Sequence, residues 1–275
     1  MSPLWRDRYC AALRPDGLAV VRRRRGLAPA LDLKQAMDLG PAEGPAWTAP
    51  VAALKDFLAR PEAGPGDLCV VLSSHLARFL LVPWNADLST PDELQAFAAA
   101  AFENVYGEAA TGWDIRVSPE RAGSPRIACA VDRELLAALE QATAGSRQRL
   151  HSVQPYLMAC YNALASRMGQ GDFLFLVSEG DRASLLAASR QEWRAVRAVP
   201  APDHPAALAS LAEREIHLSD LGGETGPEIF VHAPLRAGLV LPAVKGKAPR
   251  ILELKPMPGF SPITDGRFAM AVAAA

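Results

Sequence analysis

The sequence predicts an α/β protein with a duplicated architecture and a smaller strand–helix–strand–strand subdomain inserted between the two copies. Three observations support this fold class. Short apolar, strand-like runs alternate with helical patterns along the chain, a strand–strand–helix–strand order occurs near each end, and a further strand–helix–strand–strand segment lies between them. Half of the 275 residues are hydrophobic and 21% are charged, so the chain is expected to bury a substantial core.

The first copy is expected to open with a β-hairpin. Arg14-Pro15-Asp16-Gly17 combines residues that tight turns prefer, and apolar runs stand on both sides of it, over 8–13 and 18–24. The next expected elements are an irregular connection, a short helix and a continuous apolar strand of the buried type, over residues 26–48, 50–58 and 68–73.

The following segment carries the clearest helix signal in the sequence. Thr90 is a good N-cap, Pro91 suits the first helical position, and Glu93 can complete a capping box. Apolar residues then recur at helical spacing up to Gly107, which is expected to end the helix. The strands expected around this helix lie over residues 75–83, 113–118 and 126–131.

The rest of the chain is expected to return to the first copy and then build the second. Asp132 should cap a helix, and a strand over 149–153 leads to a helix that starts at Pro155. The elements expected beyond a glycine-rich break at 169–171 are strands over 173–177, 183–189 and 192–199, a helix over 204–215, a strand over 228–233, a proline-rich loop over 242–262 and a final strand over 267–272. The predicted division is a first subdomain over 1–73 and 132–169, an inserted subdomain over 74–131 and a second, reduced subdomain over 170–275.

Composition excludes several classes of protein. Twenty-nine basic and 30 acidic residues leave a net charge of -1, which argues against nucleic-acid binding. The apolar runs are too short to span a membrane and the N-terminus lacks a secretory signal, so a cytoplasmic location is expected. Cys10, Cys69, Cys129 and Cys160 are scattered and are expected to be buried, reduced thiols. The five histidines lack metal-ligand spacing, so no metal site is expected.

Residues 75–165, about a third of the chain, resemble a known family pattern. The motifs that carry the resemblance are Arg78-Phe79-Leu80-Leu81-Val82-Pro83, Phe102-Glu103, Trp113-Asp114, the strand over 126–131 and Val153-Gln154-Pro155-Tyr156. The pattern is similar to PilM and to the cytoplasmic part of GspL, actin-like assembly proteins of type IV pili and type II secretion.

The resemblance implies a duplicated ribonuclease-H-like fold, that of the actin-like ATPases, with the inserted subdomain characteristic of the FtsA/PilM branch. It also implies a cytoplasmic scaffold that rests against the inner membrane by binding a membrane assembly protein or the cytoplasmic tail of that protein. Self-association is left open.

Actin-like ATPases wrap phosphates with two hairpin turns, each carrying an Asp and small residues whose amides approach the anion. In the first turn, Pro15 removes an amide donor, and Gly17 follows Asp16 directly, as in an ordinary tight turn. The sequence therefore favours a structural turn at this position.

The second turn spans residues 177–182, where Gly180 matches the family glycine but Ser178 stands in place of its Asp. Glu179 and Asp181 would repel phosphates. We expect no ATPase activity and neither ATP nor magnesium as a cofactor. If ATP does bind, the expected contacts are Asp16, Gly17, Gly180, Asp181, Gly222 and Gly223.

Two further features are candidate partner contacts. Arg22, Arg23, Arg24 and Arg25 form the densest basic run, which is either a solvated strand end or a contact for anionic lipid head groups or an acidic partner tail. Without interleaved aromatic residues, this run does not indicate nucleic-acid binding. The aromatic residues Trp84, Trp113, Tyr106 and Phe102 either line a peptide groove or pack in a core.

The sequence thus predicts a non-catalytic, actin-like cytoplasmic scaffold that takes part in assembling a pilus or a type II secretion-like machine. A partner peptide would dock in the cleft between subdomains or along a strand edge. An actin-like ATPase or phosphotransferase that binds Mg-ATP in this cleft is the alternative. A metabolic enzyme on an unrelated α/β fold lacks a supporting motif, because Ser73-Ser74-His75 has no G-x-S-x-G elbow.

Overall fold

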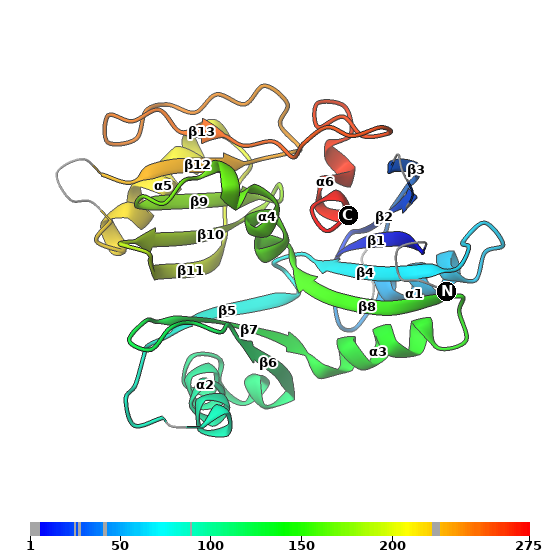
Figure 1. Ribbon diagram of the computed structural model, residues 1–275, viewed down its shortest axis with the longest axis horizontal. Helices are drawn as coiled ribbons and strands as arrows, with labels where there is room; N and C mark the ends of the chain where they lie inside the picture. The colour runs from blue at the N-terminus through cyan, green and yellow to red at the C-terminus, as the bar shows by residue number, and fades with distance from the viewer. Residues whose placement is uncertain (1–5, 25, 27–28, 41–42, 89, 222–225) are drawn as a thin grey trace.

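The computed structural model describes residues 6–24, 26, 29–40, 43–88, 90–221 and 226–275. Its strands form two five-stranded sheets and one three-stranded sheet. Figure 1 shows the two larger sheets on either side of the middle of the molecule, with the smaller sheet below them. The predicted duplicated architecture with an insertion is confirmed.

The first sheet has the order β3-β2-β1-β4-β8. Its first three strands are antiparallel neighbours, and β4 and β8 continue the sheet from β1 in parallel. The strands are β1 (Asp7–Arg14), β2 (Gly17–Arg24), β3 (Ala30–Asp38), β4 (Gly66–Leu72) and β8 (Gln148–Pro155). All seven residues of β4 are buried, as expected for a central parallel strand.

The second sheet repeats this plan with the order β11-β10-β9-β12-β13. The first three strands form an antiparallel meander, and β12 and β13 continue from β9 in parallel. The strands are β9 (Phe173–Ser178), β10 (Arg182–Ser189), β11 (Glu192–Pro200), β12 (Glu228–His232) and β13 (Arg250–Ile251). The first hairpin and this meander are both confirmed where the sequence predicted them.

The inserted subdomain is a three-stranded antiparallel sheet of order β5-β7-β6 covered by α2. Its elements are β5 (Ala77–Val82), α2 (Pro91–Tyr106), β6 (Trp113–Val117) and β7 (Arg126–Asp132). The capping box is confirmed, because Thr90 accepts from the Glu93 amide while the Glu93 carboxylate accepts from the Thr90 amide. Gly107 caps the other end of α2, as predicted.

The remaining helices connect and cover the sheets. α1 (Thr48–Leu58) and α3 (Arg133–Thr143) pack on one face of the first sheet, and α5 (Pro205–Leu218) packs on the second. The other elements are α4 (Tyr156–Leu164), α6 (Ala269–Val272) and the short 3-10 segments Gly107–Gly112, Ala165–Arg167 and Gly266–Phe268. No helix in the described part of the chain combines the length and apolar character that a bilayer crossing needs.

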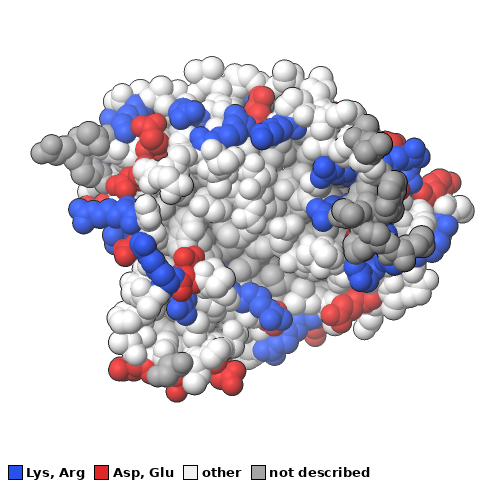
Figure 2. Space-filling view, in the orientation of Figure 1, with Lys and Arg blue, Asp and Glu red and all other residues white. Residues whose placement is uncertain are grey.

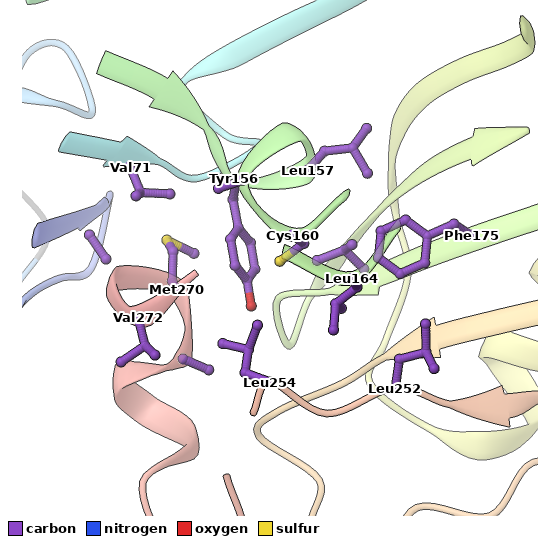
Figure 3. Close-up of a cluster of buried hydrophobic side chains, with 14 of the residues drawn as sticks. Val71, Tyr156, Leu157, Cys160, Leu164, Phe175, Leu252, Leu254, Met270 and Val272 are labelled. Carbon is purple, nitrogen blue, oxygen red and sulfur yellow. The ribbon is translucent and has the colours of Figure 1, made fainter. Parts of the chain in front are cut away.

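The largest hydrophobic cluster lies between the two five-stranded sheets. It joins strand residues of the first sheet such as Val71 to residues of the second such as Phe175, through the side chains of α4 and α6. Figure 3 shows Tyr156 of α4 extending between Met270 of α6 and Leu254. The two copies therefore share one core.

Three predictions about single elements are wrong. Residues 30–38, expected to be irregular, form the edge strand β3, where six of the nine residues are partly or fully buried. The expected final strand over 267–272 is helical, consisting of the end of a 3-10 segment and α6. A short run of alanine and valine fits a buried helix as well as a strand, so periodicity could not decide between them. The loop over 242–262 contains the short strand β13.

All four cysteines are free thiols. Cys10, Cys69 and Cys160 are buried as predicted, whereas Cys129 is only partly buried. Cys10 and Cys69 lie opposite each other on the parallel strands β1 and β4. A hydrogen bond from Cys10 lowers the pKa of Cys69 to about 6.

Candidate functional site

The two turns singled out in the sequence face each other across the space between the five-stranded sheets. Arg14, Asp16 and Gly17 of the β1–β2 turn and Ser178 and Glu179 at the end of β9 line one cavity. Strands β1 and β9 hold the same central place in the two sheets, and the turn that follows each of them lines this cavity. This cavity corresponds to the predicted cleft between subdomains.

The two charged side chains of the first turn pair with each other. The Arg14 guanidinium donates to both carboxylate oxygens of Asp16, at 2.9 and 2.6 Å. This hydrogen bonding lowers the pKa of Asp16. A Cβ on Gly17 would lie 3.1 Å from the Met37 carbonyl oxygen, so the glycine permits close pairing with β3. Asp16 is therefore engaged within its own turn.

The second turn sends a carboxylate across to the first sheet. Glu179 is only 6% exposed, and it accepts hydrogen bonds from the Ser73 hydroxyl and from the Ser74 amide at 3.0 Å. Ser73 and Ser74 directly follow β4, so this contact joins the two halves of the molecule at the base of the cleft. Gly180, at φ 102°, adopts a backbone conformation that favours glycine and allows the tight turn.

A second polar contact runs beside the first. His75 Nε2 lies 3.1 Å from Asp181 Oδ1, and the Asp181 side chain is 75% exposed. The sequence predicts that Glu179 and Asp181 repel phosphate. In the structure, each carboxylate also contacts a residue on the other side of the cleft. Gly222 and Gly223, the remaining predicted ATP contacts, lie outside the described residues.

The cavity between these turns is small. Its volume is ≈ 70 Å³, whereas pockets that hold drug-sized ligands measure about 300–1,000 Å³. Two buried hydroxyls that line it, on Tyr156 and Ser178, have no hydrogen-bond partner among the described residues. Burial raises the pKa of Tyr156 well above its usual range. The space suits a few water molecules better than a nucleotide.

The C-terminal segment occupies the rest of the cleft. Met270 and Arg267 line the same cavity as the β1–β2 turn. Two ion pairs attach this segment to the edge strand β3, Lys34 with Asp265 at 2.8 Å and Arg267 with Asp38 at 3.4 Å. Figure 1 shows α6 between the two large sheets, beside β1 and β2.

The described arginines of the predicted basic run lie on β2 in the first sheet, and two of them form ion pairs there. Arg22 donates to both carboxylate oxygens of Asp32 on the neighbouring strand, at 2.8 and 2.7 Å, and Arg24 pairs with the same carboxylate. Arg22 thereby lowers the pKa of Asp32. Arg23 is partly exposed, and Arg25 lies outside the described residues. Arg22 and Arg24 are thus engaged in holding β3 to β2.

The structure brings three of the four predicted aromatic residues together and places Trp84 apart from them. Trp113 packs edge-on against Phe102 and Tyr106 inside the inserted subdomain, with ring centroids 6.2 and 5.1 Å away. Trp84 follows β5 at the other end of that sheet and is 46% exposed. It lines an open groove of ≈ 420 Å³ whose apolar walls are Pro83, Leu88, Pro91, Leu94, Val117 and Pro119.

Sequence reasoning missed the residues that matter most in the cleft. Ser73 and Ser74 were considered only as a hydrolase fragment, and Tyr156 only as part of a packing motif. The available signal was that two hydroxyl residues directly follow a buried parallel strand, where the carboxyl ends of strands usually meet a site. No group of three or more His, Cys, Asp or Glu suited to a metal ion occurs among the described residues.

Comparison with known proteins adds information on the fold. No protein-family model matches the sequence, and no curated protein matches it. Among solved structures, the PilM-PilN type IV pilus biogenesis complex superposes with a TM-score of 0.67 at 15% identity, covering 99% of this chain and 97% of that one.

Two further structures agree with this similarity. The cytoplasmic domain of EpsL, an inner-membrane component of the Vibrio cholerae type II secretion system, has a TM-score of 0.57 at 12% identity and covers 98% of this chain and 94% of its own. A Bacteroides thetaiotaomicron protein with an actin-like ATPase fold and unknown function has a TM-score of 0.55 at 11% identity, over 86% and 84% of the two chains. The protein therefore has the duplicated actin-like fold, with an inserted subdomain, that the sequence predicted.

Proposed function

We propose that the protein is a non-catalytic actin-like scaffold that binds a cytoplasmic segment of a membrane protein in a pilus or type II secretion-like assembly. The observation that carries this proposal is the cleft, which is filled by the chain itself. Glu179 bridges it, Met270 and Arg267 close it, and ≈ 70 Å³ remains. Similarity to a structure described as a complex of PilM with PilN supports the partner class.

The docking place is the groove beside Trp84. The exposed Trp84 indole and the apolar walls of the groove can hold an apolar side chain of a short peptide. Aromatic residues such as tryptophan often contribute most of the binding energy at protein interfaces. The groove also contains Glu120 and Arg126, which can orient a partner through polar contacts. A partner bound there leaves the cleft contacts of Glu179 intact.

Two experiments test the parts of this proposal separately. The first measures thermal unfolding with and without millimolar Mg-ATP. A ligand present at 100 times its dissociation constant stabilises by about 2.7 kcal/mol, or roughly 5–11 °C for a chain of this size. We expect no shift, and a magnesium-dependent shift of that size would instead support the alternative of an ATP-binding enzyme.

The second experiment identifies the partner. A photo-crosslinking amino acid at Trp84 is expected to capture a protein with a membrane-spanning segment and a short cytoplasmic tail, in cells that naturally contain the protein. The matched control places the same group at Lys55, which is exposed on α1 on the first sheet. Equal capture at both positions, or capture of soluble proteins alone, would contradict the groove assignment.

A further inference from the structure

The segment 234–262, which we call the basic strap, differs in charge from the rest of the molecule. It contains five basic residues and one acidic residue, while the whole chain has a net charge of -1. In Figure 2 a row of Lys and Arg side chains runs along the upper part of the molecule, where Figure 1 places β13 and the strap. The strap therefore adds one row of basic side chains to this face.

Three of the five cations are not neutralised. Lys245, Arg250 and Lys255 are exposed, and none of them forms an ion pair or a hydrogen bond with the described residues. The guanidinium carbon of Arg250 lies 5.3 Å from the centroid of the Phe230 ring, a cation–π contact that leaves the guanidinium without an acidic partner. The other two cations have partners, Arg236 with Asp203 at 3.4 Å and Lys247 with Glu228 at 3.0 Å.

Apolar side chains protrude from the same segment and its continuation. Val240 is 80% exposed, although Leu239 and Leu241 on either side of it are buried. Ile263, directly after the strap, is 66% exposed. Unpaired cations and exposed aliphatic side chains in one segment match the chemistry of a bilayer interface, where phosphates lie next to hydrocarbon.

We propose that the basic strap docks directly onto the head groups of an anionic lipid bilayer, through Lys245, Arg250 and Lys255, with Val240 entering the interface. An acidic peptide fits less well, because none of the three cations lines any of the four best-formed cavities among the described residues. Single-stranded nucleic acid fits less well because the strap has no exposed aromatic residue on which bases stack.

This contact goes beyond the proposed function, since it needs no membrane partner. The strap lies at one end of the view in Figure 1 and the inserted subdomain at the other, so lipid contact leaves the groove beside Trp84 open. Loss of lipid binding and loss of partner binding are therefore separable by experiment.

The test is co-sedimentation of the purified protein with vesicles of phosphatidylcholine alone or with 30% phosphatidylglycerol. Each near-surface cation contributes about a fivefold change in partitioning, so a variant with Lys245→Gln, Arg250→Gln and Lys255→Gln is expected to bind the anionic vesicles about 100-fold more weakly. Raising the salt to 1 M shortens the Debye length to about 3 Å and should release the protein.

The matched control removes the same number of charges elsewhere, through Lys55→Gln, Arg116→Gln and Arg133→Gln on α1, β6 and α3. It is expected to change partitioning by less than about fivefold, with both variants unfolding at the wild-type temperature. Val240→Ser tests the apolar contact and should weaken binding further.

Three outcomes would overturn the proposal. The first is that the protein does not bind anionic vesicles at low salt. The second is that the strap variant and the control variant lose vesicle binding equally. The third is saturable binding of a poly-aspartate peptide that the strap variant loses while its binding to vesicles is unchanged. The last result would assign the strap to an acidic protein partner instead.

Discussion

Replacing Glu179 with alanine is expected to loosen the junction between the two halves of the protein. The substitution leaves the Ser73 hydroxyl and the Ser74 amide, both buried, without their acceptor. A buried donor that loses its partner costs about 1–3 kcal/mol, so we expect Glu179→Ala to lower the free energy of unfolding by about 2–5 kcal/mol. At 3 kcal/mol, the midpoint of thermal unfolding should fall by roughly 6–12 °C.

Urea unfolding followed by tryptophan fluorescence measures this change, with Asp181→Ala as the matched control. Asp181 is a carboxylate in the same turn and also contacts the first sheet, but its side chain is 75% exposed. The control should therefore change the free energy of unfolding by less than about 0.5 kcal/mol. A loss in both variants of similar size would show that the turn itself, and not the buried carboxylate, is at fault.

A double-mutant cycle with Ser73→Ala isolates the contact across the cleft. If the hydroxyl and carboxylate interact, the double variant should be less destabilised than the sum of the two single variants, by about 0.5–3 kcal/mol. Additivity within about 0.5 kcal/mol, or a Glu179→Ala variant as stable as the wild type, would refute the reasoning.

Three further predictions concern other parts of the chain. Burial lowers the pKa of His232 to about 4, so the unfolded chain takes up its proton first as the pH falls below 6.5. Stability should therefore drop by about 2–3 kcal/mol more between pH 7 and 4.5 than in His232→Asn, as measured by urea unfolding at each pH. Gly266→Ala would place a Cβ 2.0 Å from the Pro234 carbonyl oxygen, and an expected loss of about 1–3 kcal/mol would be measured by calorimetry. Thr90→Ala removes the cap of α2, and urea unfolding should show a loss of about 1 kcal/mol.

Elements with local signals could be predicted from the sequence. The β1–β2 turn depends on four adjacent residues, and the start of α2 depends on a capping box within four residues. Both elements can therefore be predicted from a short stretch of sequence. The edge strand β3 was missed because it alternates between exposed and partly buried residues, and because it is held by non-local contacts such as Arg22 with Asp32.

The contact across the cleft could not be predicted either, because its two sides are far apart in the sequence. The second turn was placed correctly, but the partner of Glu179 lies more than 100 residues earlier in the chain. Nothing in the neighbouring sequence indicates that a carboxylate at this position meets Ser73 and Ser74. Similarly, the strap is an irregular segment without periodicity, and only its place on the surface reveals that three of its cations are unpaired.

The shared core also determines when the protein can finish folding during synthesis. Residues 269–272 pack in the same cluster as strands β1 and β2, which are synthesised more than 200 residues earlier. Strands β1 and β2 must therefore wait for more than 200 further residues before α6 covers them. During this interval the nascent chain exposes apolar strands, a state prone to aggregation that chaperones bind. The packing of α6 against β1 and β2 consequently depends on contacts of high sequence separation, which form late in folding.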